Sequence, residues 1–302
     1  MRLLVAALLL LPLIGLLVVD FHWSGKIPGI WLLPLGIATL VLTTEEVIDL
    51  VRSTGRTVVA WPVYTGVVAI FGASYLPGLW ILSGSPYPVD CPLGRWGWPL
   101  VMTVIAVGLV VVQEIMVYQG AGGVVDRMAA GCFVIIYAAL PFCFLTQLRL
   151  FHDNRWGMAA LVSVVFVTKL SDVGAYASGR LWGRAKMCPR LSPNKTWVGA
   201  MGGVVAAGLA AWCYFQWLTP LLIADPRPHA TWWGALLFGG LLAIAGIVGD
   251  LSASMLKRDA ARKNSSSWMP GLGGVLDVVD SLLMATLPAY LCWAAGIVGP
   301  GS

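Results

Sequence analysis

The chain has 302 residues, of which 59% are hydrophobic and only 11% are charged, and it carries 15 tryptophans. Its mean hydropathy of +0.84 lies outside the range of soluble globular domains. The composition therefore excludes a soluble domain and predicts a polytopic integral membrane protein with an all-α fold.

Nine apolar stretches approach the roughly 20 residues that a helix needs to cross a hydrocarbon core. In chain order they are residues 3–19, 28–42, 58–82, 98–112, 128–145, 156–167, 197–223, 232–248 and 275–297. The first stretch could be mistaken for a secretory signal, but Asp20, Phe21 and His22 follow it and a small-residue cleavage site does not. We therefore expect about nine transmembrane helices.

The distribution of Lys and Arg predicts the orientation of these helices, because short loops rich in both residues stay in the cytoplasm. With nine spans, the N-terminus shares one side with the loops after the second, fourth, sixth and eighth spans. Of the 19 basic residues, those on the opposite side are Lys26, Arg95, Arg149, Arg155 and Arg227. The N-terminus is therefore predicted to be cytoplasmic. The net charge of +5 should lie mainly on that face, where anionic lipid or a nucleotide could bind, and no nucleic-acid partner is expected.

The polarity of the chain changes along its length. Residues 1–151 are predicted to form N-terminal transmembrane helices joined by loops of moderate length. One of these loops contains "TTEEVIDLVRS", where Thr43 and Glu46 have capping-box spacing, so we expect a helix to start there with a solvated, charged face. Residues 152–302 are predicted to form a C-terminal transmembrane catalytic domain with a polar site on the cytoplasmic side.

Two segments of this C-terminal part, residues 168–203 and 249–283, concentrate polar residues of particular types. Asp172 and Asp250 each follow directly on an apolar span, where a carboxylate is costly unless it is solvated, paired or metal-bound. Asp277 and Asp280 are spaced i, i+3, on one helical face at the start of the last span. The segments could be simple positive-inside anchors. However, carboxylates, hydroxyls and glycines are interleaved with the basic residues, and this pattern favours a phosphate-and-metal site.

The same segments limit the chemistry of such a site. "SPNKT" contains Lys195 and Thr196 but lacks the glycines of a P-loop. We find no histidine or cysteine placed to act as a nucleophile. A nucleophile that is already an anion needs neither, and a phosphate oxygen that attacks the α-phosphorus of a nucleoside triphosphate fits, because positioning and charge neutralisation supply most of the catalysis.

The motifs in these segments resemble a known family. The stretch from Ser254 to Asp280 is similar to the signature of phosphatidate cytidylyltransferases (CDP-diacylglycerol synthases), and "SDVGAYASGRLWGR" and "LSPNKTWVGAMGG" resemble two upstream stretches of that family. The first half of the chain resembles the family only in containing successive apolar segments long enough to span a membrane. The matching signature positions are Ser254, Lys257, Arg258, Lys263, Asn264, Pro270, Gly271, Leu272, Gly273, Gly274, Asp277, Val278 and Asp280.

The resemblance implies an integral membrane nucleotidyltransferase of phospholipid biosynthesis, which converts CTP and phosphatidate into CDP-diacylglycerol and pyrophosphate with Mg²⁺ as cofactor. It implies that Asp250 and Asp277 bind the metal with support from Asp280, and that these three aspartates and Lys257 form the catalytic group. The substrate-binding residues that it implies are Ser192, Lys195, Ser254, Lys257, Arg258, Lys263, Gly273 and Gly274. It further implies a bacterial-type inner (cell) membrane, with the active site on the cytoplasmic side, and leaves a homodimer open.

The chain departs from the family signature at three positions. Asn264, Leu272 and Val278 stand where the family has aspartate, histidine and arginine. Two alternatives therefore stay open. One is a non-catalytic membrane paralogue that keeps the fold. The other is a CTP-dependent lipid kinase of the polyprenol type, which would need a base for its hydroxyl nucleophile.

Overall fold

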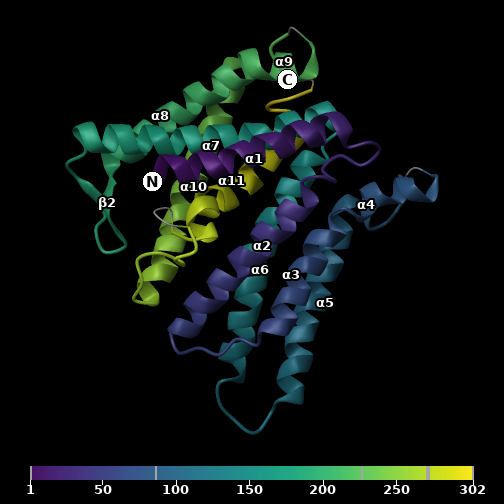
Figure 1. Ribbon diagram of the computed structural model, residues 1–302, viewed down its shortest axis with the longest axis vertical. Coiled ribbons are helices and arrows are strands. Elements are labelled where there is room, and N and C mark those ends of the chain that lie inside the picture. The colour runs from purple at the N-terminus through teal and green to yellow at the C-terminus, as the bar shows by residue number, and fades with distance from the viewer. Residues whose placement is uncertain (1, 86, 226, 270–272, 301–302) are drawn as a thin grey trace. The chain divides into compact units, whose positions relative to one another are not determined.

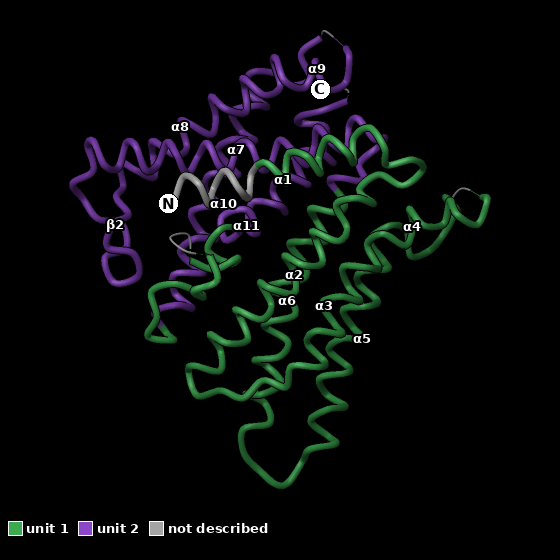
Figure 2. The backbone as a smooth tube through the Cα atoms, viewed as in Figure 1, with its two compact units in different colours: residues 1–147, 259–278 green, residues 148–258, 279–302 purple. Residues whose placement is uncertain are grey.

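The computed structural model describes residues 2–85, 87–225, 227–269 and 273–300, and of residues 2–10 only the helical backbone (Figure 1). Leu272 lies outside the described residues. By its internal packing the chain forms two compact units, coloured separately in Figure 2. Unit 1 contains residues 1–147 and 259–278, and unit 2 contains residues 148–258 and 279–302. The predicted division at residue 151 concerns function rather than packing and stays a prediction.

Unit 1 is a group of helices, of which α2, α3 and α5 run side by side in Figure 1. Small residues bring their axes close: Gly66 of α3 lies against Ala106 of α5, where a larger side chain would not fit. The helices are α1 (Arg2–Trp23), α2 (Leu33–Ser53), α3 (Ala60–Ala73), α4 (Leu76–Leu79), a 3₁₀ turn (Trp80–Ser83), α5 (Gly94–Met116) and most of α6 (Val124–Arg149).

The second half of α2 corrects one expectation. The helix does not start near Thr43, because it is continuous from Leu33 to Ser53, with a proline in its first turn. The expected solvated face is also wrong for Glu46, which is 5% exposed, although Glu45 and Asp49 on the same helix are exposed. Thr43 is fully buried. Capping-box spacing alone could not distinguish a helix start from a buried helical turn.

Unit 2 is built on α7 (Asn154–Trp182), α8 (Trp197–Cys213), and the parts of α10 (Trp232–Asp259) and α11 (Val275–Ala294) that belong to it. A hairpin of β1 (Lys186–Cys188) and β2 (Ser192–Thr196) connects α7 to α8, and a π-helical turn (Tyr214–Leu218) joins α8 to α9 (Thr219–Ile223). Its core combines alanines on the helix faces with an aromatic group formed by Tyr214, Phe215, Phe238 and Trp293.

The packing of α7 against α8 depends on small residues. The two helices lie along each other (Figure 1), and a Cβ atom at Gly174 of α7 would collide with Ala206 of α8. Gly202 and Gly203 of α8 in turn face Ser178 and Ser171 of α7. Such close backbone approach is typical of helices that associate within a membrane.

Among the described residues, six helices are long and apolar enough to cross a membrane, and a seventh counts if α3 and the bent segment Leu76–Ser83 form one span. They indicate an integral membrane protein. The prediction of nine spans is not confirmed, and the β1–β2 hairpin departs from an all-helical chain. Two helices extend beyond the predicted apolar stretches, so Asp172 lies inside α7 and Asp250 lies inside α10.

Candidate functional site

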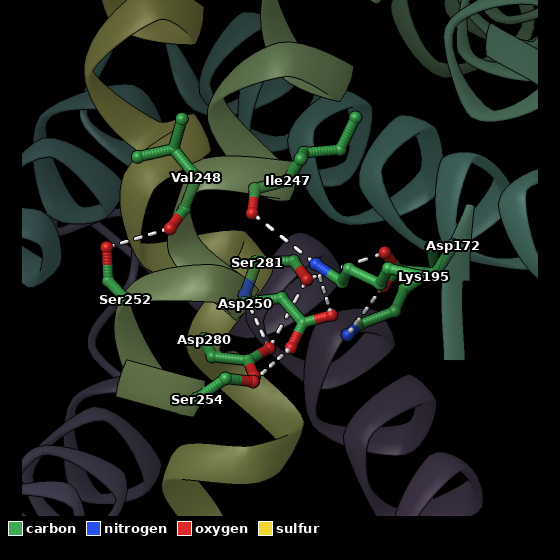
Figure 3. A network of polar contacts seen from close by, with 10 residues as sticks. Asp172, Lys195, Ile247, Val248, Asp250, Ser252, Ser254, Asp280 and Ser281 are labelled. Atoms are coloured by element: carbon green, nitrogen blue, oxygen red, sulfur yellow. Dashed lines mark hydrogen bonds and ion pairs between the residues drawn. The ribbon is translucent and has the colours of Figure 1, made fainter. Parts of the chain in front are cut away.

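The polar residues of unit 2 form a network of carboxylates, hydroxyls and lysines (Figure 3). Lys195 Nζ lies 2.7 Å from Asp250 Oδ2 and donates to the carbonyl oxygen of Ile247 at 3.5 Å. The lysine comes from β2 and the aspartate from α10, so the ion pair joins the hairpin to that helix. The two side chains are 21% and 38% exposed, which keeps this pair within reach of a ligand.

Lys195 is held in position by the residues at the base of the hairpin. It precedes Thr196, which is the N-cap of α8 and accepts a hydrogen bond at Oγ1 from the Gly199 amide at 3.1 Å. Thr196 is buried against Gly179 and Gly183 at the end of α7, where a Cβ at either glycine would crowd it. Because β2 leads directly into α8, Lys195 cannot move far without disturbing this cap.

Two further aspartates meet at Ser281 of α11. Ser281 Oγ lies 3.4 Å from Asp172 Oδ1 of α7 and 3.3 Å from Asp280 Oδ1 (Figure 3). Asp280 Oδ1 also accepts the Ser281 amide at 2.6 Å, and Lys169 Nζ lies 3.6 Å from Asp172 Oδ2. Asp280 is 6% exposed, whereas Asp172 is exposed. The network therefore contains an open carboxylate and a buried one.

The close approach of α10 and α11 brings Asp250 and Asp280 into the same network. A Cβ at Gly249, next to Asp250, would collide with the backbone of Asp280. Gly246, one turn earlier, lies against Ser281 with ordinary contact distance. The glycine that precedes Asp250 is thus a packing requirement of the crossing.

The remaining predicted residues of unit 2 lie along the last turns of α10 and in the hairpin. Ser254 Oγ donates to Asp250 Oδ1 at 3.4 Å, and Arg258 Nε donates to the carbonyl oxygen of Leu191 at 3.2 Å. Lys257 is only 8% exposed and lies within electrostatic range of Asp280. A buried ammonium is costly unless a carboxylate compensates it, so these two charges support each other. Ser192, at the start of β2, is half-buried.

The predicted residues of unit 1 lie around the first turn of α11. Asp277 Oδ2 accepts the amides of Ser265 and Gly274, both at 3.0 Å, and lies 3.0 Å from the Ser265 hydroxyl, whose single proton also faces Glu46. Gly273 has a φ of +93°, a left-handed conformation that favours glycine, and exchanges backbone hydrogen bonds with Met269. Asp277 is thus bound to the loop that precedes its helix.

The other predicted positions of this loop differ in exposure. Lys263 and Asn264 are exposed, and Val278 is half-buried on α11. Of these departures from the family signature, Asn264 is therefore a solvent-exposed amide and Val278 is a half-buried apolar residue. Neither position buries a charged group.

The fit of a magnesium ion can be tested on the donors. Besides the Lys195 ammonium, the side chains around Asp250 are carboxylates and hydroxyls, which are hard oxygen ligands of the kind that Mg²⁺ prefers. Within the described residues, however, no group of three or more His, Cys, Asp or Glu side chains is arranged to hold a metal by itself. The donors fit an ion that is bound by one or two carboxylates and completed by substrate phosphate and water, as is usual for Mg²⁺.

Sequence reasoning missed several members of these networks. Ser281 gave no signal beyond its place next to Asp280, and Lys169 was read as a positive-inside residue. Glu46 is the larger omission, because it accepts hydrogen bonds from Ser265 and Ser266 in the loop that precedes α11. The available signal was that Glu46 follows a long apolar stretch directly, as Asp172 and Asp250 do.

The chain is similar to proteins of known class over most of its length. It matches the model of the cytidylyltransferase family over residues 2–295. A phosphatidate cytidylyltransferase of Brucella suis is 31% identical over 257 residues, which cover 78% of this chain and 88% of the relative. One of Pseudomonas aeruginosa is 36% identical over 183 residues, covering 59% and 62%. One of Mycobacterium bovis is 27% identical over 271 residues, covering 88% and 80%.

Proposed function

The chain belongs to the cytidylyltransferase family, and from that premise we propose that it is an integral membrane phosphatidate cytidylyltransferase. In the proposed reaction it converts CTP and phosphatidate into CDP-diacylglycerol and pyrophosphate, a step of phospholipid biosynthesis. The observation that carries the proposal is the network of Lys195, Asp250, Asp172 and Asp280 in unit 2, because it combines oxygen ligands for a hard cation with a cation for phosphate.

The reaction needs positioning more than acid–base chemistry. A phosphate oxygen of phosphatidate forms a bond to the α-phosphorus of CTP, and the bond from that phosphorus to the bridging oxygen of the β-phosphate breaks, so that pyrophosphate leaves. The nucleophile is already an anion, which fits a site whose side chains are carboxylates, hydroxyls and cations. The residues must therefore bring two polyanions together and stabilise the charge that moves to the leaving group.

We assign the cationic roles to Lys195, Lys257 and Arg258, which would bind the triphosphate and the lipid phosphate. Lys195 lies on β2, and Arg258 donates to the carbonyl oxygen of Leu191 in the turn that precedes β2, so both cations belong to or contact the same hairpin. Ser192 and Ser254 would donate hydrogen bonds to phosphate oxygens, and Lys263, Gly273 and Gly274 complete the proposed set. Preformed cations cost no reorganisation when the leaving group develops charge.

The family resemblance assigns a magnesium ion to Asp250, Asp277 and Asp280, and we keep that assignment as a proposal. When bound, the ion would supply charge neutralisation at the triphosphate. Asp250 already holds Lys195, so the proposed site has a cation next to the phosphates in addition to the metal. We further propose that the N-terminus and the site face the cytoplasm of a bacterial-type inner membrane, where CTP is available.

An assay with labelled CTP tests this proposal. We expect purified protein in detergent with Mg²⁺ and phosphatidate to transfer label from the α-phosphate of CTP to lipid and to release pyrophosphate. A lipid kinase would instead transfer label from the γ-phosphate and release CDP, so parallel reactions with the two labels and a polyprenol acceptor distinguish the two activities. Failure to transfer either label would contradict the enzymatic proposal and favour a non-catalytic paralogue.

A further inference from the structure

The carboxylate of Glu46, on α2, lies at the N-terminus of α11 within unit 1. Its Oε1 accepts the Val275 amide and the Ser266 hydroxyl, both at 2.8 Å. Its Oε2 accepts the Leu276 amide at 2.8 Å and the Ser265 hydroxyl at 2.7 Å. Each carboxylate oxygen therefore receives one backbone and one hydroxyl donor.

This arrangement stabilises a charge that would otherwise be costly. Glu46 is 5% exposed, and a buried carboxylate without donors is strongly destabilised. The first amides of a helix have no partner inside the helix and carry its positive end, so a carboxylate there is favoured. Val275 and Leu276 are the first two residues of α11, and Glu46 thus caps this helix from a segment more than 200 residues away.

The contacts also select the carboxylate over its uncharged isostere. Backbone amides can only donate, so both terminal atoms of residue 46 must accept. Glutamine would direct its NH₂ group against one of the two amides and lose that bond. The position of Gly274 agrees with this, because a Cβ there would collide with the Glu46 carboxylate and with Ser265. The absence of a side chain at Gly274 leaves room for Glu46.

Ser265 connects Glu46 to Asp277. Its hydroxyl lies 2.7 Å from Glu46 Oε2 and 3.0 Å from Asp277 Oδ2, and its amide donates to the same Asp277 oxygen at 3.0 Å. Ser265 is fully buried. The residue that orients Asp277 is therefore itself held by Glu46.

We propose that Glu46 is a positioning residue for the catalytic segment: by capping α11 and holding Ser265, it fixes the conformation of residues 264–269 and 273–274 and the orientation of Asp277. The inference rests on the proposed function for its effect on turnover, but its structural part does not depend on that function. It assigns to the N-terminal half of the chain a direct role in arranging the signature motif.

The test compares Glu46→Gln with Glu45→Gln, which makes the same change of charge at the exposed neighbouring residue of α2. Hydrogen–deuterium exchange of the full-length protein in detergent is the first measurement. A hydrogen bond to a charged group is worth about one to two powers of ten in an equilibrium. We therefore expect amides of residues 264–269 and 273–278 to exchange about ten- to a hundredfold faster in Glu46→Gln, while α3 and α5 exchange as in the wild type and Glu45→Gln shows no local change.

The second measurement is the dependence of CDP-lipid formation on the magnesium concentration. A lower fraction of folded protein would reduce the maximal rate without moving the midpoint. A displaced Asp277 should instead raise the concentration needed for half-maximal activity, and we expect a shift of about tenfold in Glu46→Gln and none in Glu45→Gln. Unchanged local exchange together with an unchanged midpoint would overturn the proposal.

A second variant and the exchange measurement cover the cases in which Glu46→Gln does not fold or the wild type is inactive. If Glu46→Gln does not fold, Ser265→Ala removes only the hydroxyl that connects the two carboxylates, and it should shift the magnesium midpoint in the same direction by a smaller factor. No shift in folded Ser265→Ala would then refute the positioning role. If the wild-type protein makes no CDP-lipid, the proposed function fails, whereas the exchange comparison still decides whether Glu46 holds the loop.

Discussion

Among single residues, the carboxylates of unit 2 differ in their surroundings, and this difference suggests different roles. Asp250 is paired with Lys195 and is partly exposed, so a ligand can reach it. Asp280 is almost completely buried and accepts hydrogen bonds from Ser281, so its charge acts on its neighbours from inside the helices. We therefore expect Asp250 to contact the metal or substrate and Asp280 to support it.

Replacing the proposed metal ligands should abolish turnover and leave the protein folded. Asp250→Asn and Asp277→Asn each exchange a carboxylate for a neutral amide, which is a far poorer ligand for a hard cation. Loss of one preorganised electrostatic group typically costs about a hundred- to a thousandfold in kcat, and we expect at least that loss in the labelled-CTP assay.

The matched control for this experiment is Arg180→Ala. Arg180 is exposed at the end of α7, and its guanidinium contacts the Tyr176 hydroxyl one turn away. Exposed charges contribute little, so turnover should stay within about fivefold of the wild type. Equal losses in all three variants would mean that the site requires positive and negative surface charge in general rather than metal ligands.

At the scale of elements, close contact between α10 and α11 determines where the network forms. Gly249 lies against the backbone of Asp280, so the two helices approach there without intervening side chains. This places Asp250, the next residue along α10, beside the start of the unit 2 part of α11. The geometry of the network therefore depends on a contact that contains no polar side chain.

A methyl group at this contact should separate the helices. Gly249→Ala forces a Cβ against backbone atoms, which cannot yield as a flexible side chain does, and overpacking of this kind costs about 1–3 kcal/mol. We expect a lower unfolding temperature in detergent and a loss of CDP-lipid formation larger than the loss of folded protein.

Gly240→Ala provides the control on the same helix. A Cβ at Gly240 meets no atom within 4 Å, and alanine favours a helix over glycine by about 1 kcal/mol. This variant should be as stable as the wild type or slightly more stable, with unchanged activity. If both variants behaved alike, helix propensity rather than the α10–α11 contact would govern this segment.

For the whole molecule, the orientation in the membrane decides which solvent compartment can supply the substrates to the polar residues. The bias of Lys and Arg predicts that Asp250, Lys257 and Asp277 face the cytoplasm. The six apolar helices agree with a membrane protein, and their number does not determine the orientation.

Cysteine labelling tests the orientation. In a background without native cysteines, Ser267→Cys introduces a thiol at an exposed position of the loop before α11, and Val89→Cys introduces one at an almost fully exposed position before α5. We expect an impermeant reagent to label position 89 in intact cells and position 267 only after the membrane is opened. Labelling of position 267 in intact cells would reverse the proposed topology.

The sequence by itself determined the class of the protein and most of the candidate residues. An apolar composition requires helices that satisfy their own backbone hydrogen bonds, and "SPNKT" and the stretch from Ser254 to Asp280 carried the family resemblance. Lys195 was named from "SPNKT" and Asp250 from its place directly after an apolar span, and the structure joins them in an ion pair. Local patterns could identify each residue because each lies in a short polar segment, whereas the contact between the two segments comes from the fold.

Only the tertiary structure revealed the partners that come from distant parts of the chain. Glu46 and Ser265 are separated by 219 positions, and capping-box spacing had suggested a solvated helix start for a residue that in fact caps another helix. The end of α7 beyond residue 167 and that of α10 beyond residue 248 were likewise misjudged, because hydropathy indicates where a helix can meet lipid and not where its backbone hydrogen bonds end. Burial and hydrogen-bond partners depend on three-dimensional packing, which periodicity in one segment cannot specify.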